Sequence, residues 1–158
     1  MSPIEVEIRR LPPMSVVCTQ VTSPHPEADA WEKLSAWADP AGLLKDPAAH
    51  PVFGFNNPPP EPNATIYGYE LWISVDPETP AISGLERKEF PGGLYAVTTC
   101  RVLGDPHGSV PEVWQHLLAW SKDHGYRWRQ THELERLVNP GAPDKDITLE
   151  LCLPIEED

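Results

Sequence analysis

The chain has 158 residues, a formal net charge of −12 at pH 7 and 40% apolar residues. This length and this apolar content suit a single domain with a well-formed core. The acidic balance argues against direct nucleic-acid binding and against anionic membranes, because both need a basic protein surface.

No targeting or membrane segment is visible in the sequence. Residues 1–10 lack the apolar run of a signal peptide, and no stretch approaches the roughly 18 apolar residues of a membrane span. Cys18, Cys100 and Cys152 occur singly, and the six histidines show no metal-ligand spacing. We therefore predict a cytoplasmic protein with reduced thiols and with no metal or cofactor. The sequence does not predict its oligomeric state.

Apolar patterning predicts strands and helices in a recurring order. In the first half we expect strand segments at 4–10 and 15–21, a helix at 27–38, and strands at 52–56 and 67–75. In the second half we expect strands at 85–90 and 94–102, a helix at 110–123, and strands at 133–138 and 147–155. The second helix has a capping box at residues 109–112 and Gly125 beyond its end.

The order recurs because the sequence repeats itself. Residues 31–37 and 114–120 both read WxxLxAW. Two further segments recur in the same order: Asn57-Pro58 as Asn139-Pro140, and Glu70-Leu71-Trp72-Ile73 as Glu150-Leu151-Cys152-Leu153. We predict one α+β domain over 1–158, built from duplicated β-α-β-β modules at about 3–80 and 82–157. The modules should be related by a pseudo-two-fold axis, with antiparallel sheets forming a concave groove.

Alternation along two strands indicates which side chains face the helices. Tyr69, Leu71, Ile73 and Val75 share one face of their strand, as Ile147, Leu149, Leu151 and Leu153 share one face of theirs. The opposite faces then carry Glu70, Trp72 and Ser74 in one copy, and Thr148, Glu150 and Cys152 in the other. Burying an indole contributes roughly 2–3 kcal/mol, so the other sheet, a second chain or a ligand should cover Trp72. An aromatic groove with a few carboxylates is typical of a small-molecule site.

Six motifs, taken in order, carry a resemblance that spans nearly the whole chain. They are VFGFNNP at 52–58, YGYELW at 67–72, FPGGLYAV at 90–97, the helix with Trp114 and Trp120, ERLVNP at 135–140 and LCLPI at 151–155. The chain resembles the GyrI-like small-molecule-binding domains, the effector-binding domains of AraC-type and MerR-type transcription regulators. The resemblance implies two β-α-β-β modules around a groove that binds lipophilic, often cationic compounds. Some stand-alone relatives hydrolyse cyclopropane-containing toxins, and others inhibit gyrase.

The resemblance also implies a buried glutamate beneath aromatic rings, in an E-x-Y stretch of the second module. Here it maps to Glu135, with Leu137 in the place of the tyrosine, and Glu133 is a competing alignment. In the first copy the corresponding position is Val52 or Phe53, so a carboxylate at 135 indicates a role gained by one copy. The alternative interpretation of Glu135 is an exposed residue at a strand edge.

Four further residues are candidates for the ligand groove. Glu70 could bind a ligand or be a rim carboxylate paired with a basic residue, and Trp72 and Tyr95 could line the groove or pack in the core. Phe53 and Phe55 share a face that the sequence does not identify, and we select Phe55 because it lies nearer the loop.

Three functions remain open from the sequence. The first is a stand-alone protein that binds a lipophilic, cationic or aromatic compound, because aromatic faces and a desolvated carboxylate both attract cations. The second is a hydrolase of strained electrophilic toxins in which Glu135 acts as a general base. The third is a protein-binding inhibitor of the gyrase-inhibitor type. Arg127 and Arg129, which flank Trp128, are interpreted as part of a solvated face.

Overall fold

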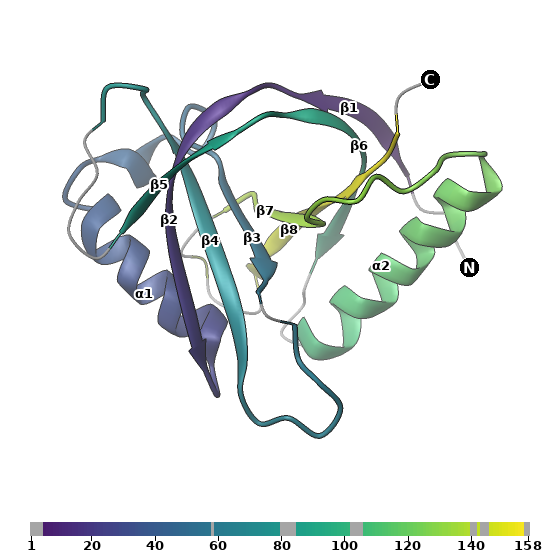
Figure 1. Ribbon diagram of the computed structural model, residues 1–158, viewed down its shortest axis with the longest axis horizontal. Helices are drawn as coiled ribbons and strands as arrows, with labels where there is room; N and C mark the ends of the chain where they lie inside the picture. The colour runs from purple at the N-terminus through teal and green to yellow at the C-terminus, as the bar shows by residue number, and fades with distance from the viewer. Residues whose placement is uncertain are drawn as a thin grey trace. The chain divides into compact units, whose positions relative to one another are not determined.

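The computed structural model describes residues 5–57, 59–79, 85–101, 106–139, 142 and 146–156. The protein is α+β, as predicted, with antiparallel strand pairs and two α-helices in this part of the chain (Figure 1). In chain order the elements are β1 (Glu7–Leu11), β2 (Met14–Ser23), α1 (Pro26–Ala38), a 3-10 turn η1 (Leu43–Lys45), β3 (Val52–Asn56), β4 (Tyr67–Val75), β5 (Glu86–Phe90), β6 (Gly93–Arg101), α2 (Pro106–Asp123), β7 (Leu134–Leu137) and β8 (Thr148–Pro154).

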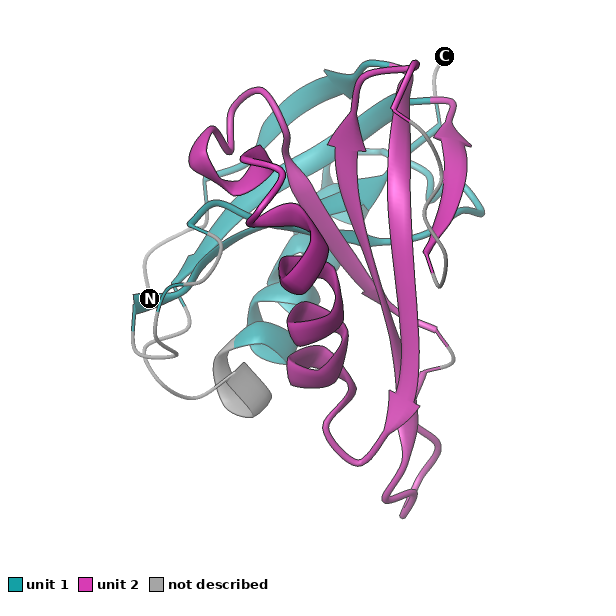
Figure 2. Ribbon diagram, turned by 90° about the vertical axis from the view of Figure 1, so that its left-hand side faces the viewer, with its two compact units in different colours: residues 1–12, 92–158 teal, residues 13–91 magenta. Residues whose placement is uncertain are grey.

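The chain divides into two compact units, coloured separately in Figure 2. Unit 1 holds residues 1–12 and 92–158, and unit 2 holds residues 13–91. In unit 2 the strands lie in the order β3-β4-β2-β5, and in unit 1 they lie in the order β1-β6-β8-β7. Each unit therefore contains one β-α-β-β run, β2-α1-β3-β4 or β6-α2-β7-β8, and one additional strand.

The additional strand of each unit is not the one that the predicted module limits assign to it. It is β1 in unit 1 and β5 in unit 2. Limits at 3–80 and 82–157 would group β1 with β2 and β5 with β6, whereas β1 pairs with β6 and β5 pairs with β2. Only Pro12-Pro13 separates β1 from β2. Tight two-residue hairpins need positive φ angles, which proline cannot adopt, so β1 cannot fold back on β2. Superposition of the two predicted halves stays a prediction.

In unit 2 the helix covers one face of the sheet. The Tyr67 hydroxyl donates a hydrogen bond of 2.6 Å to Glu27 of α1, and the Ser23 hydroxyl donates one of 2.6 Å to Asp29. These contacts place the odd-numbered side chains of β2 and β4 against α1, as the alternation predicts. The even-numbered side chains of both strands, Trp72 among them, face away from the helix.

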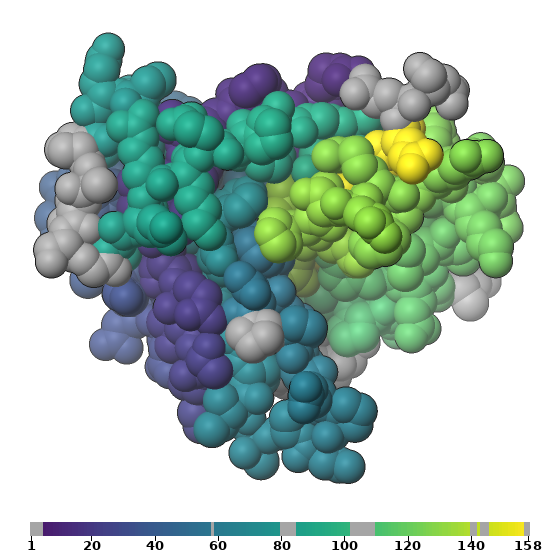
Figure 3. Space-filling model, in the orientation of Figure 1, coloured from purple at the N-terminus to yellow at the C-terminus, as the bar shows by residue number. Residues whose placement is uncertain are grey.

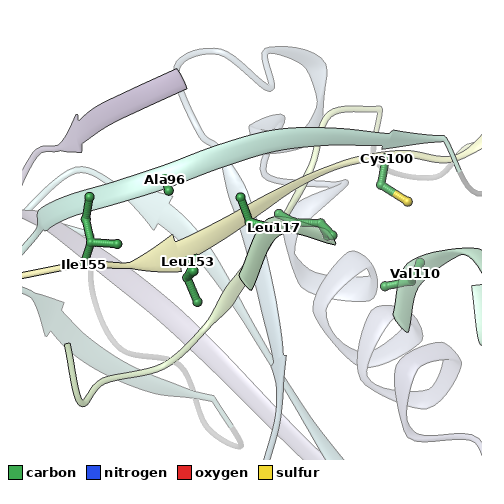
Figure 4. Packing of buried hydrophobic residues seen from close by; sticks show 7 residues of the cluster. Ala96, Cys100, Val110, Leu117, Leu153 and Ile155 are labelled. Carbon is green, nitrogen blue, oxygen red and sulfur yellow. The ribbon is translucent and has the colours of Figure 1, made fainter. Parts of the chain in front are cut away.

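In unit 1 the helix also packs on one sheet face. Ala96, Cys100, Leu117, Leu151 and Leu153 belong to one buried cluster beneath α2 (Figure 4). The predicted seat of the second helix on the odd-numbered residues of β8 is thus confirmed.

Two details of the second helix differ from what its sequence predicts. The i, i+3, i+4 spacing of Trp114, Leu117 and Leu118 predicts one apolar face toward the sheet, but Leu118 is 45% exposed. The helix begins at Pro106, one turn before the expected capping box, because proline suits the first helical position. None of the helices in the described ranges is long and apolar enough to cross a membrane.

Candidate functional site

Glu70 lies in the interior of unit 2, on the sheet face that points away from α1. In the strand register it stands opposite Gln20 of β2 and Phe55 of β3, so all three share that face. Its exposed fraction is only 2%, which is unusual for a glutamate.

Three donors hold the Glu70 carboxylate. The Trp72 indole Nε1 donates to Oε2 at 2.6 Å, the Lys88 ammonium donates to the same oxygen at 2.9 Å, and Asn57 Nδ2 donates to Oε1 at 3.0 Å. Burial by itself raises the pKa of Glu70, but the hydrogen bonds from Trp72, Lys88 and Asn57 outweigh it, so the pKa lies below its ordinary value. Glu70 is therefore a charged carboxylate whose burial is compensated by three hydrogen-bond donors.

Aromatic rings surround Trp72 on the same face. Its ring centroid lies 5.0 Å from that of Phe55 in an edge-to-face arrangement and 5.5 Å from that of Phe90. Trp72 is 7% exposed, and Cys18 stands opposite it on β2 with a thiol pKa that burial raises to about 12. The sequence candidates Glu70, Trp72 and Phe55 thus form one cluster, which we call the Glu70 cluster.

Tyr95 belongs to unit 1, on the face of β6 that points away from α2. The guanidinium of Arg129 lies over its ring, 5.0 Å from the centroid. Arg129 also donates to the carbonyl oxygens of Leu94 and Ile155, each at 3.3 Å. Gly93 leaves room for this guanidinium, because a Cβ atom there would lie 2.5 Å from Arg129 Nη2. Arg129 was expected on a solvated face, and this expectation is wrong, since the ring and the carbonyls hold its side chain.

Glu135 lies on the opposite face of the unit 1 sheet from Tyr95. It stands opposite Leu151 of β8, in the layer that packs beneath α2, and is half-buried. The indole Nε1 of Trp114 on α2 donates to Glu135 Oε2 at 3.3 Å. Burial raises the pKa of the Cys100 thiol, and the charge of Glu135 adds to that rise. Glu135 and Tyr95 therefore cannot line the same surface of this sheet.

A second compensated carboxylate, which the sequence did not single out as a site, lies in unit 1. Glu150 accepts hydrogen bonds of 2.9 Å from Arg9 and 2.9 Å from Arg136. Burial raises the pKa of Glu150, and the two guanidinium groups lower it further than burial raises it. The repeat had matched Glu150 with Glu70, and both carboxylates face away from their unit's helix and carry a basic partner. The alignment of Glu150 with Glu70 in the repeat is the sequence feature that could have predicted a partly buried carboxylate at position 150.

Glu133, the competing alignment, has an exposed side chain, although desolvation of its carboxyl group raises its pKa. Among the described residues, no three His, Cys, Asp or Glu side chains gather so that they could hold a metal ion. Sequence reasoning missed Lys88 and Asn57, because a lysine on one strand and an asparagine at the end of another show no local motif.

In the described residues each unit holds four antiparallel strands with one helix on one of their faces, which places the protein in the α+β class. Residues 4–156 match the model of the GyrI-like small molecule binding domain. The chain belongs to this family, and the resemblance seen in the sequence is confirmed. None of the curated proteins matches the chain.

Solved structures share the fold at low sequence identity. An uncharacterized conserved protein from Listeria innocua superposes with a TM-score of 0.69 at 10% identity, covering 98% of this chain and 93% of its own. A hydrolase from Listeria innocua has a TM-score of 0.66 at 12% identity, covering 98% and 94%. The protein SAV2435 bound to tetraphenylphosphonium has a TM-score of 0.63 at 14% identity, covering 97% and 94%. At these identities the likeness establishes the fold alone.

Proposed function

We propose that this protein binds a lipophilic cationic or aromatic compound and that Glu135 recognises the ligand's positive charge. The observation that carries the proposal is the setting of Glu135: a half-buried carboxylate in the apolar layer beneath α2, in contact with the indole of Trp114. A carboxylate in poorly hydrated surroundings attracts a cation more strongly than one in water, and an adjacent aromatic ring adds a cation–π contribution.

The Glu70 cluster is the other place where a carboxylate meets aromatic rings. Lys88 already places an ammonium 2.9 Å from Glu70, so a ligand cation would have to displace that partner before it gained the same attraction. Trp72 and Phe55 could still provide apolar contact to a ligand. Tyr95 already has the Arg129 guanidinium over its ring. We choose Glu135 for charge recognition because it is half-buried in the apolar layer beneath α2 and in contact with the indole of Trp114.

A relative of the same fold supports the choice of ligand class. The structure of SAV2435 holds tetraphenylphosphonium, a lipophilic cation, and its chain is 14% identical to this one. That ligand is therefore the first probe to use.

The test is a titration with tetraphenylphosphonium and with neutral triphenylphosphine oxide, read by isothermal calorimetry. Glu135→Gln keeps the side-chain shape and removes the charge. Tetraphenylphosphonium has no hydrogen-bond donor, so the loss is one of charge attraction, about 1–3 kcal/mol for a partly buried pair, and affinity for the cation should fall by roughly 5- to 150-fold. Affinity for the neutral compound should change little. Glu133→Gln, two residues away and exposed, is the matched control and should leave both affinities unchanged. Equal loss in both variants, or no loss in either, would contradict the role of Glu135.

A hydrolase is the second candidate function, because one structure of the same fold is that of a hydrolase. In that case Glu135 would remove a proton from a water molecule that attacks a strained electrophile. Glu135→Gln should then lower turnover by roughly 10²- to 10⁴-fold while substrate binding survives. Retained turnover in the variant would exclude this role for Glu135.

A further inference from the structure

A hollow of about 340 Å³ lies in unit 1 beside the C-terminal half of α2, and its lining residues include neither Glu135 nor a member of the Glu70 cluster. Its lining residues are Leu118, Ala119, Ser121, Lys122, Tyr126, Trp128, Leu153 and Ile155. The end of α2 and the segment that follows it lie on the surface in the space-filling view, in the green and yellow-green part of Figure 3. We call this hollow the α2-end pocket.

The wall of the α2-end pocket is built by ordered backbone contacts. After α2, Gly125 adopts a φ of 80°, its N–H donates to the carbonyl of Lys122, and the N–H of Tyr126 donates to the carbonyl of Ser121. This pair of hydrogen bonds is a Schellman motif, which turns the chain sharply at the end of a helix. The pocket wall therefore starts from a fixed turn.

The segment beyond the turn is tied to the end of β8. Trp128 forms a β-bridge with Ile155, the N–H of Glu156 donates to the carbonyl of Arg127 at 2.8 Å, and the N–H of Arg129 donates to the carbonyl of Pro154 at 3.1 Å. Because both sides of Trp128 are fixed to β8, its position beside α2 does not depend on a ligand. A site formed in advance loses little conformational entropy on binding.

Two large apolar side chains at this pocket remain open to solvent. Trp128 is 50% exposed and Leu118 is 45% exposed, while Leu153 and Ile155 beneath them are fully buried. The floor is thus apolar and dry, and the rim offers an indole face. An aromatic ring of one or two cycles would fit the volume and bury part of this surface.

Ser121 lies beside the apolar floor, but its hydroxyl oxygen is buried and has no hydrogen-bond partner among the described residues. A ligand in the hollow would therefore gain its polar contact from another side chain. The charged residue in the lining is Lys122, so the charge that the pocket itself presents is positive.

We infer that the α2-end pocket is a second ligand site, for a small planar aromatic acid. The ring would pack against Trp128 and Leu118, and the acid group would accept a hydrogen bond from the Lys122 ammonium. This pocket would select an anionic ligand, whereas the site proposed at Glu135 would select a cationic one. The chain's overall negative charge opposes such a ligand only weakly at physiological salt, where the screening length is about 8 Å.

Three probes that share a naphthalene ring test the inference: 2-naphthoate, neutral 2-naphthalenemethanol and 2-naphthylmethylammonium, each titrated into the full chain by calorimetry. The anion should bind most tightly and the ammonium compound least tightly. Lys122→Gln should weaken the binding of 2-naphthoate several-fold and leave the affinity for the neutral compound unchanged. Lys33→Gln on α1, which removes the same charge from another exposed helix position, should change neither.

One further variant assigns the binding to this pocket. Trp128→Ala should weaken the binding of all three probes, because it removes the exposed indole face of the rim. The inference fails if 2-naphthoate does not bind, if Lys122→Gln or Trp128→Ala binds it as tightly as the parent chain, or if Glu135→Gln abolishes its binding.

A second copy of the chain is the competing occupant of the pocket. Sedimentation of the parent chain should show the same mass with and without 2-naphthoate. A dimer that Trp128→Ala or 2-naphthoate dissociates would overturn the ligand site and assign this surface to self-association.

Discussion

Replacing Glu70 by glutamine should destabilise unit 2, because it removes a charge that three donors hold. Hydrogen bonds to a charged group contribute about 1.5–3 kcal/mol and neutral ones about 0.5–1.5 kcal/mol. Glutamine has one acceptor oxygen, so with that oxygen in the place of Oε2 the bonds from Trp72 and Lys88 should each lose about 1 kcal/mol, and the Asn57 amide would face an NH2 group in place of an acceptor. The Lys88 contribution must be reduced, since its side chain is 41% exposed and water screens the pair. We therefore expect Glu70→Gln to lower the free energy of unfolding by about 2 kcal/mol at pH 7.

The pH dependence gives this prediction a distinct signature. The pKa of Glu70 is lower in the folded chain than the value of about 4.3 expected in the unfolded chain. Its stabilising contribution is therefore complete above about pH 4.3 and is lost as the pH falls through the folded value. The stability difference between the parent chain and Glu70→Gln should be constant from pH 6 to 8 and should shrink below pH 4.

The assay is urea unfolding followed by circular dichroism at a series of pH values. Glu89→Gln is the matched control, because Glu89 lies on β5 next to Lys88 and its side chain is 70% exposed. The control should change stability by less than about 0.5 kcal/mol. An equal loss in both variants, or a Glu70→Gln difference that persists at pH 3, would refute the role assigned to the buried carboxylate.

Two further predictions concern packing within the units. Gly54→Ala should destabilise the protein by about 1–3 kcal/mol in urea unfolding, because the Tyr69 ring lies where the new Cβ atom would be. In a Tyr69→Ala background, which is less stable in itself, the additional cost of Gly54→Ala should be much smaller. Cys18 and Cys152 should react with a disulfide reagent only under denaturing conditions at pH 8, because burial raises the pKa of each thiol to about 12; rapid labelling of either in the native protein would contradict their burial.

Local patterns were sufficient for the elements and for the faces of their strands. β3 and β4 have the predicted limits, 52–56 and 67–75, since alternating side chains bounded by prolines are a signal within each segment. Because side chains alternate between the two faces of a strand, the sequence also placed Glu70 and Trp72 on one face of β4 and Leu71 and Ile73 on the other. The repeat and the ordered motifs were sufficient to identify the family.

Tertiary structure decided which segments meet. The pairing of β1 with β6, the ammonium of Lys88 on Glu70 and the guanidinium of Arg129 on Tyr95 all join residues far apart in the chain. No local pattern encodes such pairs, because the partner of a strand depends on which edge is left open after the others have paired. For the same reason the sequence could name Tyr95 and Glu135 as candidates, but only the strand register of unit 1 put them on opposite faces of one sheet.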